Sequence, residues 1–254
     1  MKMSSELKQF DPLRFQSAET QLSIAALMKA RGNDGGARTL YGREFLEPWK
    51  AVASREIWFG QMAGAPPADS FTIKRTPAPP ELDGILSDPC WQRATELWLR
   101  GENIDTRRGS YAAAAYDGEY LYIAAAVKRH ESTMEVETKR GGREYDADLG
   151  NHDRLTWTID IDRDYATAYQ LQVDQRGHTT DACWIDRTWN PKWYVAATSD
   201  KTHWRVEAAI PLDELSPTRP KRLEAWAVGI KRTLPGYGSS SYTTGKPGLA
   251  MFGR

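Results

Sequence analysis

The chain has 254 residues, of which 40% are hydrophobic and 27% charged, as is usual for a globular protein. Lysine plus arginine and aspartate plus glutamate number 34 each. This neutral balance gives no electrostatic reason to expect a nucleic acid or an anionic membrane as the partner. No apolar run reaches the roughly 18 residues of a membrane-spanning helix, and the N-terminus lacks the apolar segment of a signal peptide.

Residues 1–63 form the first predicted unit, a helical arm or the C-terminal end of an upstream helical domain. The stretch 17–32 has Ser17 as an N-cap candidate and apolar residues at helical spacing. A second helical stretch covers about 42–63, where Pro48 predicts a break or kink. Helices of this size bury little apolar surface. We therefore expect them to belong to a larger helical unit or to dock onto the following domain.

Residues 64–80 are rich in proline and are predicted to be a linker. One strand candidate lies within it, at 71–75. From 81 to 254 the sequence has the pattern of strands. The segment 109–128 places Asp117-Gly118 between two strand-like runs, which predicts a hairpin although its alanine-rich half favours a helix on propensity alone.

Further strands follow along the chain. Residues 153–162 alternate apolar and polar side chains with a period of two, and another hairpin is predicted to turn near Arg176-Gly177. Strands are also expected at 203–212 and 224–233, with a short helical turn at 211–215. Many short strands with few helices predict an all-β fold. We expect a jelly-roll-like antiparallel β-sandwich of two sheets, preceded by the short helical N-terminal arm.

Ten tryptophans are the unusual feature of the composition, because aromatic side chains dominate both cores and binding faces. Trp157 and Trp204 are in phase with apolar neighbours of their strands and are predicted to be core residues. Cys90 and Cys183 do not have metal-site spacing and are expected to be two buried free thiols. A bridge between them is the alternative in an oxidising compartment.

Five motifs in order carry a resemblance to a known family. They are "PPELDGILSDPCWQRATEL", "YDGEYLYIAAAVK", "HDRLTWTIDID", "WRVEAAIPLDEL" and "MFGR", spread over about 79–254. Together they resemble the family 9 carbohydrate-binding modules and the wider dopamine-monooxygenase-N-terminal-like group. The resemblance implies a sandwich of two antiparallel sheets. It also implies a non-catalytic module that binds a glycan end or polysaccharide, within a larger exported bacterial protein that has flanking helical or catalytic domains.

The same resemblance implies a secreted or periplasmic location, which the sequence itself does not show. It also suggests a chain clipped after Phe252-Gly253, where the family completes a strand. Two tryptophans clamp the sugar in family members, but the corresponding regions here, 146–152 and 242–250, contain none. A glutamate and an arginine of that site correspond to Thr156 and Gln172. An alternative function is therefore a structural or protein-interaction sandwich that has lost the sugar site, with the arm docked onto it.

Trp189, Asn190 and Trp193 are the first candidates for sugar contacts. An indole face can stack on a pyranose ring, and an amide can bond its hydroxyls. The alternative, which we favour, is a lid packed on the sandwich edge. The polar loop 139–153 is expected beside the family's ligand position. The full candidate ligand set is Trp189, Asn190, Trp193, His152, Asp153, Thr156, Gln172 and Tyr242.

Three acids at alternate positions, Asp160, Asp162 and Asp164, are a candidate site for a structural calcium, since calcium prefers oxygen ligands. The alternative is a solvated hairpin turn, because no glycine or closing glutamate follows. No other cofactor is expected. The four histidines lack zinc-site spacing, and a haem held by His130 with Met134 is a weaker alternative.

Catalysis is not expected. Glu207 and Asp213 flank a strand end, but a glycosidase needs two carboxylates that face each other across a cleft. Glu207 stands in an otherwise apolar strand, and we expect it to pair with Arg205 or Lys231.

Overall fold

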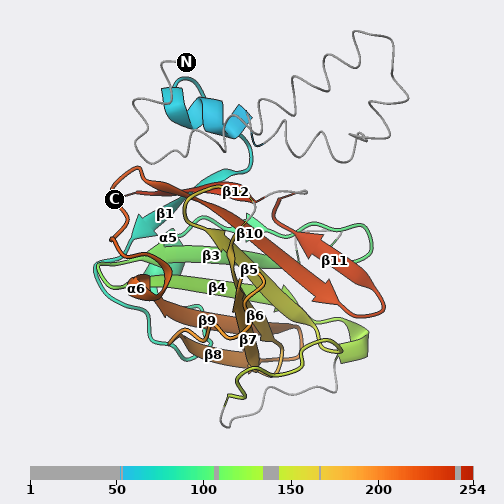
Figure 1. Ribbon diagram of the computed structural model, residues 1–254. Helices are drawn as coiled ribbons and strands as arrows, with labels where there is room; N and C mark the ends of the chain where they lie inside the picture. The colour runs from blue at the N-terminus through green and yellow to red at the C-terminus, as the bar shows by residue number, and fades with distance from the viewer. Residues whose placement is uncertain are drawn as a thin grey trace, which may run out of the picture.

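The structure is a computed structural model that describes residue 52 and residues 54–105, 109–133, 143–165, 167–243 and 247–253. The helical stretch predicted at 17–32, and Pro48, lie outside these residues. Within them the chain forms twelve strands and few helices, which confirms the all-β prediction. The strands follow one curled path, β7-β6-β5-β10-β12-β1-β3-β4-β9-β8, with β11 on β10 and β2 on β3 (Figure 1).

The path folds into two sheets that share β1. Sheet A contains β5 (Arg154–Asp160), β6 (Tyr169–Asp174), β7 (Thr179–Cys183), β10 (Ala225–Leu234), β11 (Gly238–Ser241) and β12 (Gly248–Phe252). Sheet B contains β2 (Leu97–Trp98), β3 (Tyr111–Tyr116), β4 (Tyr120–Lys128), β8 (Tyr194–Ser199) and β9 (His203–Pro211). Three short helices lie between the strands: α5 (Pro89–Arg93), η1 (Glu131–Thr133) and α6 (Leu212–Leu215).

Strand β1 (Ser70–Arg75) joins the two sheets, which confirms the strand candidate at 71–75. Its first four residues pair with β12, and its last two pair with β3. Both pairings are parallel, whereas the other strand pairings of the described residues are antiparallel. The sandwich is therefore a mixed sheet at this seam, a feature that no local pattern in the sequence shows.

The two predicted hairpins form. Strands β3 and β4 pair through the turn at Asp117-Gly118, whose carboxylate accepts hydrogen bonds from the amides of Glu119 and Tyr120 at 2.7 and 2.8 Å. Strands β6 and β7 pair through the turn at 175–178. The helical turn expected at 211–215 is α6. These elements depend on residues that are close in sequence, so the sequence pattern predicts them well.

The main core lies between the inner faces of the two sheets. Trp157 of β5 and Trp204 of β9 are each 1% exposed, as predicted. The indole Nε1 of Trp204 donates to Asp153 at 3.0 Å. Asp153 also accepts from the guanidinium of Arg232 at 2.9 and 2.7 Å, and Arg232 forms a second ion pair with Asp105. A buried charge network of this kind is tolerated because each group has partners.

Glu207 is fully buried on the outer side of sheet B, and its expected pairing with Arg205 or Lys231 is wrong. Its carboxylate accepts from the amides of Asp83 and Gly84 at 3.2 and 2.7 Å, and from Nε1 of Trp91 at 2.6 Å. The Leu-Asp-Gly turn and the tryptophan of α5 are therefore fastened to β9 through one carboxylate. This explains why an acid interrupts an apolar strand.

Residues 54–61 form a helix that packs against sheet A near β1 and β12 (Figure 1, blue). Phe59 is 4% exposed and clusters with Ala225 and Leu249. Arg55 forms an ion pair with Asp69. No helix among the described residues is long and apolar enough to cross a membrane.

Both cysteines are free thiols. Cys90 is buried, as expected, whereas Cys183 is partly exposed, so the expectation of two buried thiols is correct for only one of them.

Candidate functional site

Polar side chains form a row across the outer face of sheet A. Lys231, Thr156, Gln172 and Thr180 are successive register partners in β10, β5, β6 and β7. Because paired residues of neighbouring strands point to the same face, these four side chains lie in one line. The alternating residues of β5 are buried in the core. The structure thus brings Thr156 and Gln172 together as direct neighbours on a solvated face.

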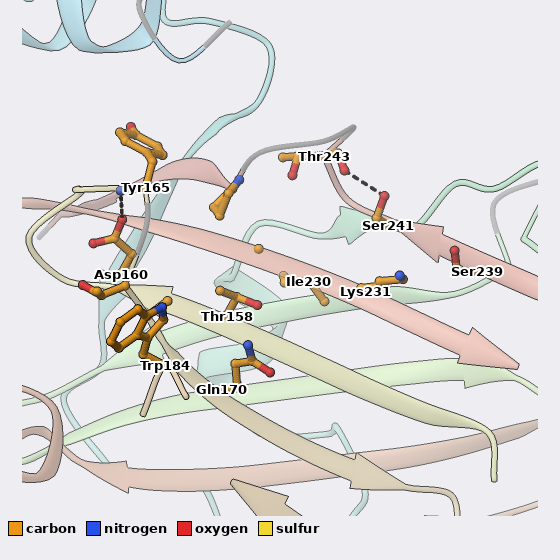
Figure 2. A pocket seen from close by; sticks show the side chains of 14 residues that line it. Thr158, Asp160, Tyr165, Gln170, Trp184, Ile230, Lys231, Ser239, Ser241 and Thr243 are labelled. Carbon is orange, nitrogen blue, oxygen red and sulfur yellow. Dashed lines mark hydrogen bonds between the residues drawn. The ribbon is translucent and has the colours of Figure 1, made fainter. Parts of the chain in front are cut away.

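Two hollows lie on this face of sheet A. The first has a volume of about 520 Å³, and Trp184, Thr158, Gln170 and Lys231 are among the side chains that line it (Figure 2). The second has a volume of about 780 Å³, and Gln172 belongs to its lining. Gln170 and Trp184 line both hollows. We call the two adjacent hollows the sheet A groove.

Trp184 is the exposed aromatic residue of the sheet A groove, with 54% of its side chain accessible, and its neighbour Ile185 is 74% exposed. Both lie in a tight turn in which Cys183 and Asp186 exchange backbone hydrogen bonds of 2.9 Å. Trp184 has a left-handed backbone, φ 56°, which is uncommon for a bulky residue. Trp184 and Ile185 together leave an apolar surface open to solvent at the edge of the groove.

Trp184 is not among the predicted ligand residues, although the alternation of side chains along β7 indicates its position. Thr180 is the register partner of Gln172, and Trp184 follows Thr180 and Ala182 at even spacing. Side chains alternate along a strand, so this spacing places Trp184 on the face of the polar row. The alternation can be seen in the sequence, but the face on which Trp184 lies is known only once the strand register is known.

The stretch around Trp189 and Trp193 is a lid and does not line the sheet A groove. Trp193 is 2% exposed, its Nε1 donates to Asp181 at 3.1 Å, and the guanidinium of Arg143 covers its ring at 4.6 Å. The ring of Trp193 is therefore covered in this structure, and a sugar contact by it stays a prediction that this burial disfavours. Trp189 is half-buried with its ring 4.7 Å from that of Tyr169.

Asn190 is exposed next to this lid, away from both hollows. Asp153 is 1% exposed and its oxygens accept hydrogen bonds from Trp204 and Arg232, which disfavours the predicted ligand contact. His152 is half-buried and outside the lining of both hollows. Burial, followed by the nearby positive charge of Arg176, lowers its pKa.

Tyr242 packs against the core instead of facing the sheet A groove. Its ring meets that of Phe71 edge to face, with centroids 5.6 Å apart. Burial raises the pKa of Tyr242. Of the eight candidate ligand residues, the structure places only Thr156 and Gln172 on the grooved face.

The acids Asp160, Asp162 and Asp164 converge at the end of β5, with one oxygen of each within 4.8 Å of the others. Burial, then a hydrogen bond with Asp162, raises the pKa of Asp160 to about 7. A calcium ion would fit such a set of oxygens, but it takes six to eight of them. Both oxygens of Asp164 already accept hydrogen bonds from Thr167 at 2.6 Å. The calcium site therefore stays a prediction.

The catalytic and haem alternatives gain no support from the described residues. Glu207 is enclosed by Gly84 and Trp91 and does not face Asp213 across a cleft. His130 contacts Ser132 and its ring lies 4.2 Å from that of Tyr237. Met134, its expected partner, lies outside the described residues.

The described residues thus form an all-β sandwich with an exposed tryptophan beside a row of polar side chains. No family model and no curated protein matches the sequence. Among solved structures, the chain is similar to one described as a carbohydrate-binding protein from Bacteroides uniformis. The TM-score is 0.53 and the identity 12%, and the match covers 72% of this chain and 98% of that one.

A family 9 carbohydrate-binding module from Caldicellulosiruptor kristjanssonii also matches. Its complex with cellotriose has a TM-score of 0.49 and 14% identity, over 73% of this chain and 94% of that one. Its complex with glucose has a TM-score of 0.48 and 14% identity, over 72% and 96%. The match to the Bacteroides protein, with a TM-score above 0.5 and 12% identity, concerns the fold alone. Together with the observed strands it confirms the all-β sandwich fold that the sequence motifs implied.

Proposed function

We propose that this sandwich is a non-catalytic carbohydrate-binding module and that its ligand lies in the sheet A groove. The observation that carries the proposal is Trp184, whose ring is half-exposed between two hollows lined by polar side chains. The fold likeness to a protein described as carbohydrate-binding supports it. The ligand would be a glycan end or a segment of polysaccharide.

The chemistry of the sheet A groove suits a sugar. The apolar face of a pyranose stacks on an indole, and its hydroxyls both donate and accept hydrogen bonds. The side-chain amides of Gln170 and Gln172 offer both hydrogen-bond donors and acceptors, and Thr158 offers a hydroxyl. Lys231 adds a cationic donor at one end of the row. This set replaces the two clamp tryptophans that the resembling family uses.

We further propose that the module acts within a larger exported bacterial protein, secreted or periplasmic, beside helical or catalytic domains. The resemblance of the five sequence motifs supports this context. An upstream signal peptide and a neighbouring hydrolase in the same reading frame would test it.

Isothermal titration against glucose, cello-oligosaccharides and a panel of other glycans tests the ligand site. We expect Trp184→Ala to weaken binding by up to about tenfold, since stacking on an aromatic ring contributes about 0.5–1.5 kcal/mol beyond the area that it buries. Trp189→Ala is the matched control, because it removes a tryptophan of the lid outside the groove. The proposal would be contradicted if none of the sugars gave a binding heat with the wild type. Equal loss of affinity in the two variants would also contradict it.

A second candidate function is a structural or interaction sandwich that docks the preceding helical segment. The helix at 54–61 favours it, because Arg55, Glu56 and Phe59 of that helix are buried against the sandwich. This interpretation predicts that the separate helical region, residues 1–63, captures residues 64–254 in a pull-down. It further predicts no sugar binding in the titration above.

A further inference from the structure

A third hollow, of about 390 Å³, lies where β1 ends and the β3–β4 turn meets the loop between α6 and β10. It shares no lining residue with the sheet A groove. Its lining consists of Arg75, Tyr116, Asp117, Gly118, Arg219, Pro220, Arg222 and Gly253. Three arginines from two distant segments therefore surround one hollow, which we call the arginine pocket.

Asp117 is the only acid in this lining, and its carboxylate already accepts hydrogen bonds from the protein. Asp117 accepts hydrogen bonds from the amides of Glu119 and Tyr120 and, at 2.6 Å, from the hydroxyl of Tyr122. Burial tends to raise the pKa of Asp117, but these hydrogen bonds outweigh it and the pKa is lowered. Asp117 is thus ionised at neutral pH and offsets one guanidinium. An excess of positive charge remains in the pocket lining.

The guanidinium groups keep donors that other side chains do not use, although the charge of Arg75 acts on nearby Asp117. Nη2 of Arg75 lies 4.0 Å from where a Cβ would stand at Gly118, so the group sits beside the turn. Arg219 and Arg222 are exposed. Within the described residues, no side-chain hydrogen bond or ion pair is made by any of the three arginines.

The loop that carries two of these arginines is fixed by hydrogen bonds. The amide of Lys221 donates to the carboxylate of Glu224, and the amide of Leu223 donates to the carbonyl of Phe252 at 2.8 Å. The backbone that carries Arg219 and Arg222 is therefore fixed beside the pocket. Positive charges around one hollow favour an anion there.

We propose that the arginine pocket binds a small oxyanion, phosphate or sulfate, either as the free ion or as an ester group on a small molecule. The planar guanidinium presents paired N–H donors that match the oxygens of such anions. A dianion would offset the excess charge of the pocket lining. The pocket is larger than a single ion, which leaves room for the carrier of an ester. This site is independent of the proposed carbohydrate site.

Isothermal titration of the full chain with inorganic phosphate and with glycerol 3-phosphate tests the proposal. Glycerol serves as the uncharged reference, and sodium chloride keeps the ionic strength constant. We expect both anions to bind and the double variant Arg219→Gln/Arg222→Gln to weaken binding by at least about tenfold, since hydrogen bonds to charged groups are the strong ones. Arg75→Gln should weaken it as well. Tighter binding of the ester identifies the ester as the preferred source of the anion.

The control Lys192→Gln/Lys201→Gln removes two exposed positive charges outside the pocket and should leave phosphate binding unchanged. Trp184→Ala should also leave it unchanged, which separates this proposal from the carbohydrate site. The proposal is overturned if the wild-type chain binds neither anion. It is equally overturned if the arginine variants bind as the wild type does, or if the lysine control loses as much affinity.

Discussion

At the scale of single residues, Glu207 connects three segments through one carboxylate. Glu207→Ala would leave the amides of Asp83 and Gly84 and the indole N–H of Trp91 without their acceptor. Each buried donor left unsatisfied costs about 1–3 kcal/mol. We expect the substitution to lower the free energy of unfolding by about 3 kcal/mol or more, measured by urea denaturation. Glu119→Gln, an exposed control, should change it little.

Single residues also show where sequence patterns succeed. The burial of Trp157 and Trp204 follows from strand phase alone, which is a local property. The burial of Trp193 and Asp153 does not, since it depends on Arg143 and on Arg232, which approach from other elements. Strand phase makes a side chain's face predictable. Its partners across the fold become visible only when the sheets are assembled.

At the scale of elements, the acidic turn after β5 predicts a pH effect. The folded-state pKa of Asp160, about 7, lies above its ordinary value of 3.8. The native state therefore keeps a proton that the unfolded state loses between these values, and ionisation of Asp160 removes stability as pH rises through about 7. We expect Asp160→Asn to be more stable than the wild type at pH 8 without calcium. The difference should shrink as the pH is lowered towards 5.

Thermal melts at pH 5, 6, 7 and 8, with and without calcium, measure this effect. If the acidic turn binds calcium, the ion should raise the melting temperature of the wild type at pH 8 and leave Asp160→Asn unchanged. Asp213→Asn, an exposed acid elsewhere, is the control. An Asp160→Asn variant that melts below the wild type at pH 8 would show that the ionised carboxylate stabilises the turn.

Elements differ in how far the sequence predicts them. The hairpins β3–β4 and β6–β7 follow from Asp117-Gly118 and the turn near Gly177, which are local signals. The parallel pairing of β1 with β12 joins segments at opposite ends of the described chain. The strand itself was predicted at 71–75 within a proline-rich linker, but its partners were not. Parallel pairing between distant segments leaves no turn motif to find.

At the scale of the whole molecule, the helix at 54–61 belongs to the sandwich that it covers. Glu56 accepts a hydrogen bond from the hydroxyl of Tyr165 and lies 3.3 Å from the guanidinium of Arg163. Arg163 also stacks over the ring of Phe59, 4.8 Å away, and donates to the carbonyl of Ala225. Removing this helix would expose the apolar patch under Phe59 and leave buried charges without their counterions.

A chain that begins at residue 64 should therefore be less stable than one that begins at residue 51. Burial of a phenylalanine side chain alone contributes about 1.5–3 kcal/mol, and loss of the ion pairs adds to the cost. We expect a loss of about 3 kcal/mol or more in urea denaturation. Equal unfolding midpoints for the two chains would show instead that the helix is a separable arm.

Removal of the helix at 54–61 should also weaken ligand binding in the sheet A groove. Tyr165 lines the first hollow of the sheet A groove, while its hydroxyl is bonded to Glu56 of the helix. Loss of the helix removes the hydrogen bond of Tyr165 and should weaken sugar binding. Phosphate binding in the arginine pocket should persist, because among the described residues no side-chain hydrogen bond or ion pair joins the lining of that pocket to the helix. Glu56→Gln in the full chain isolates this contact. If it lowers sugar affinity without unfolding the protein, helix docking and ligand binding are coupled through a single tyrosine.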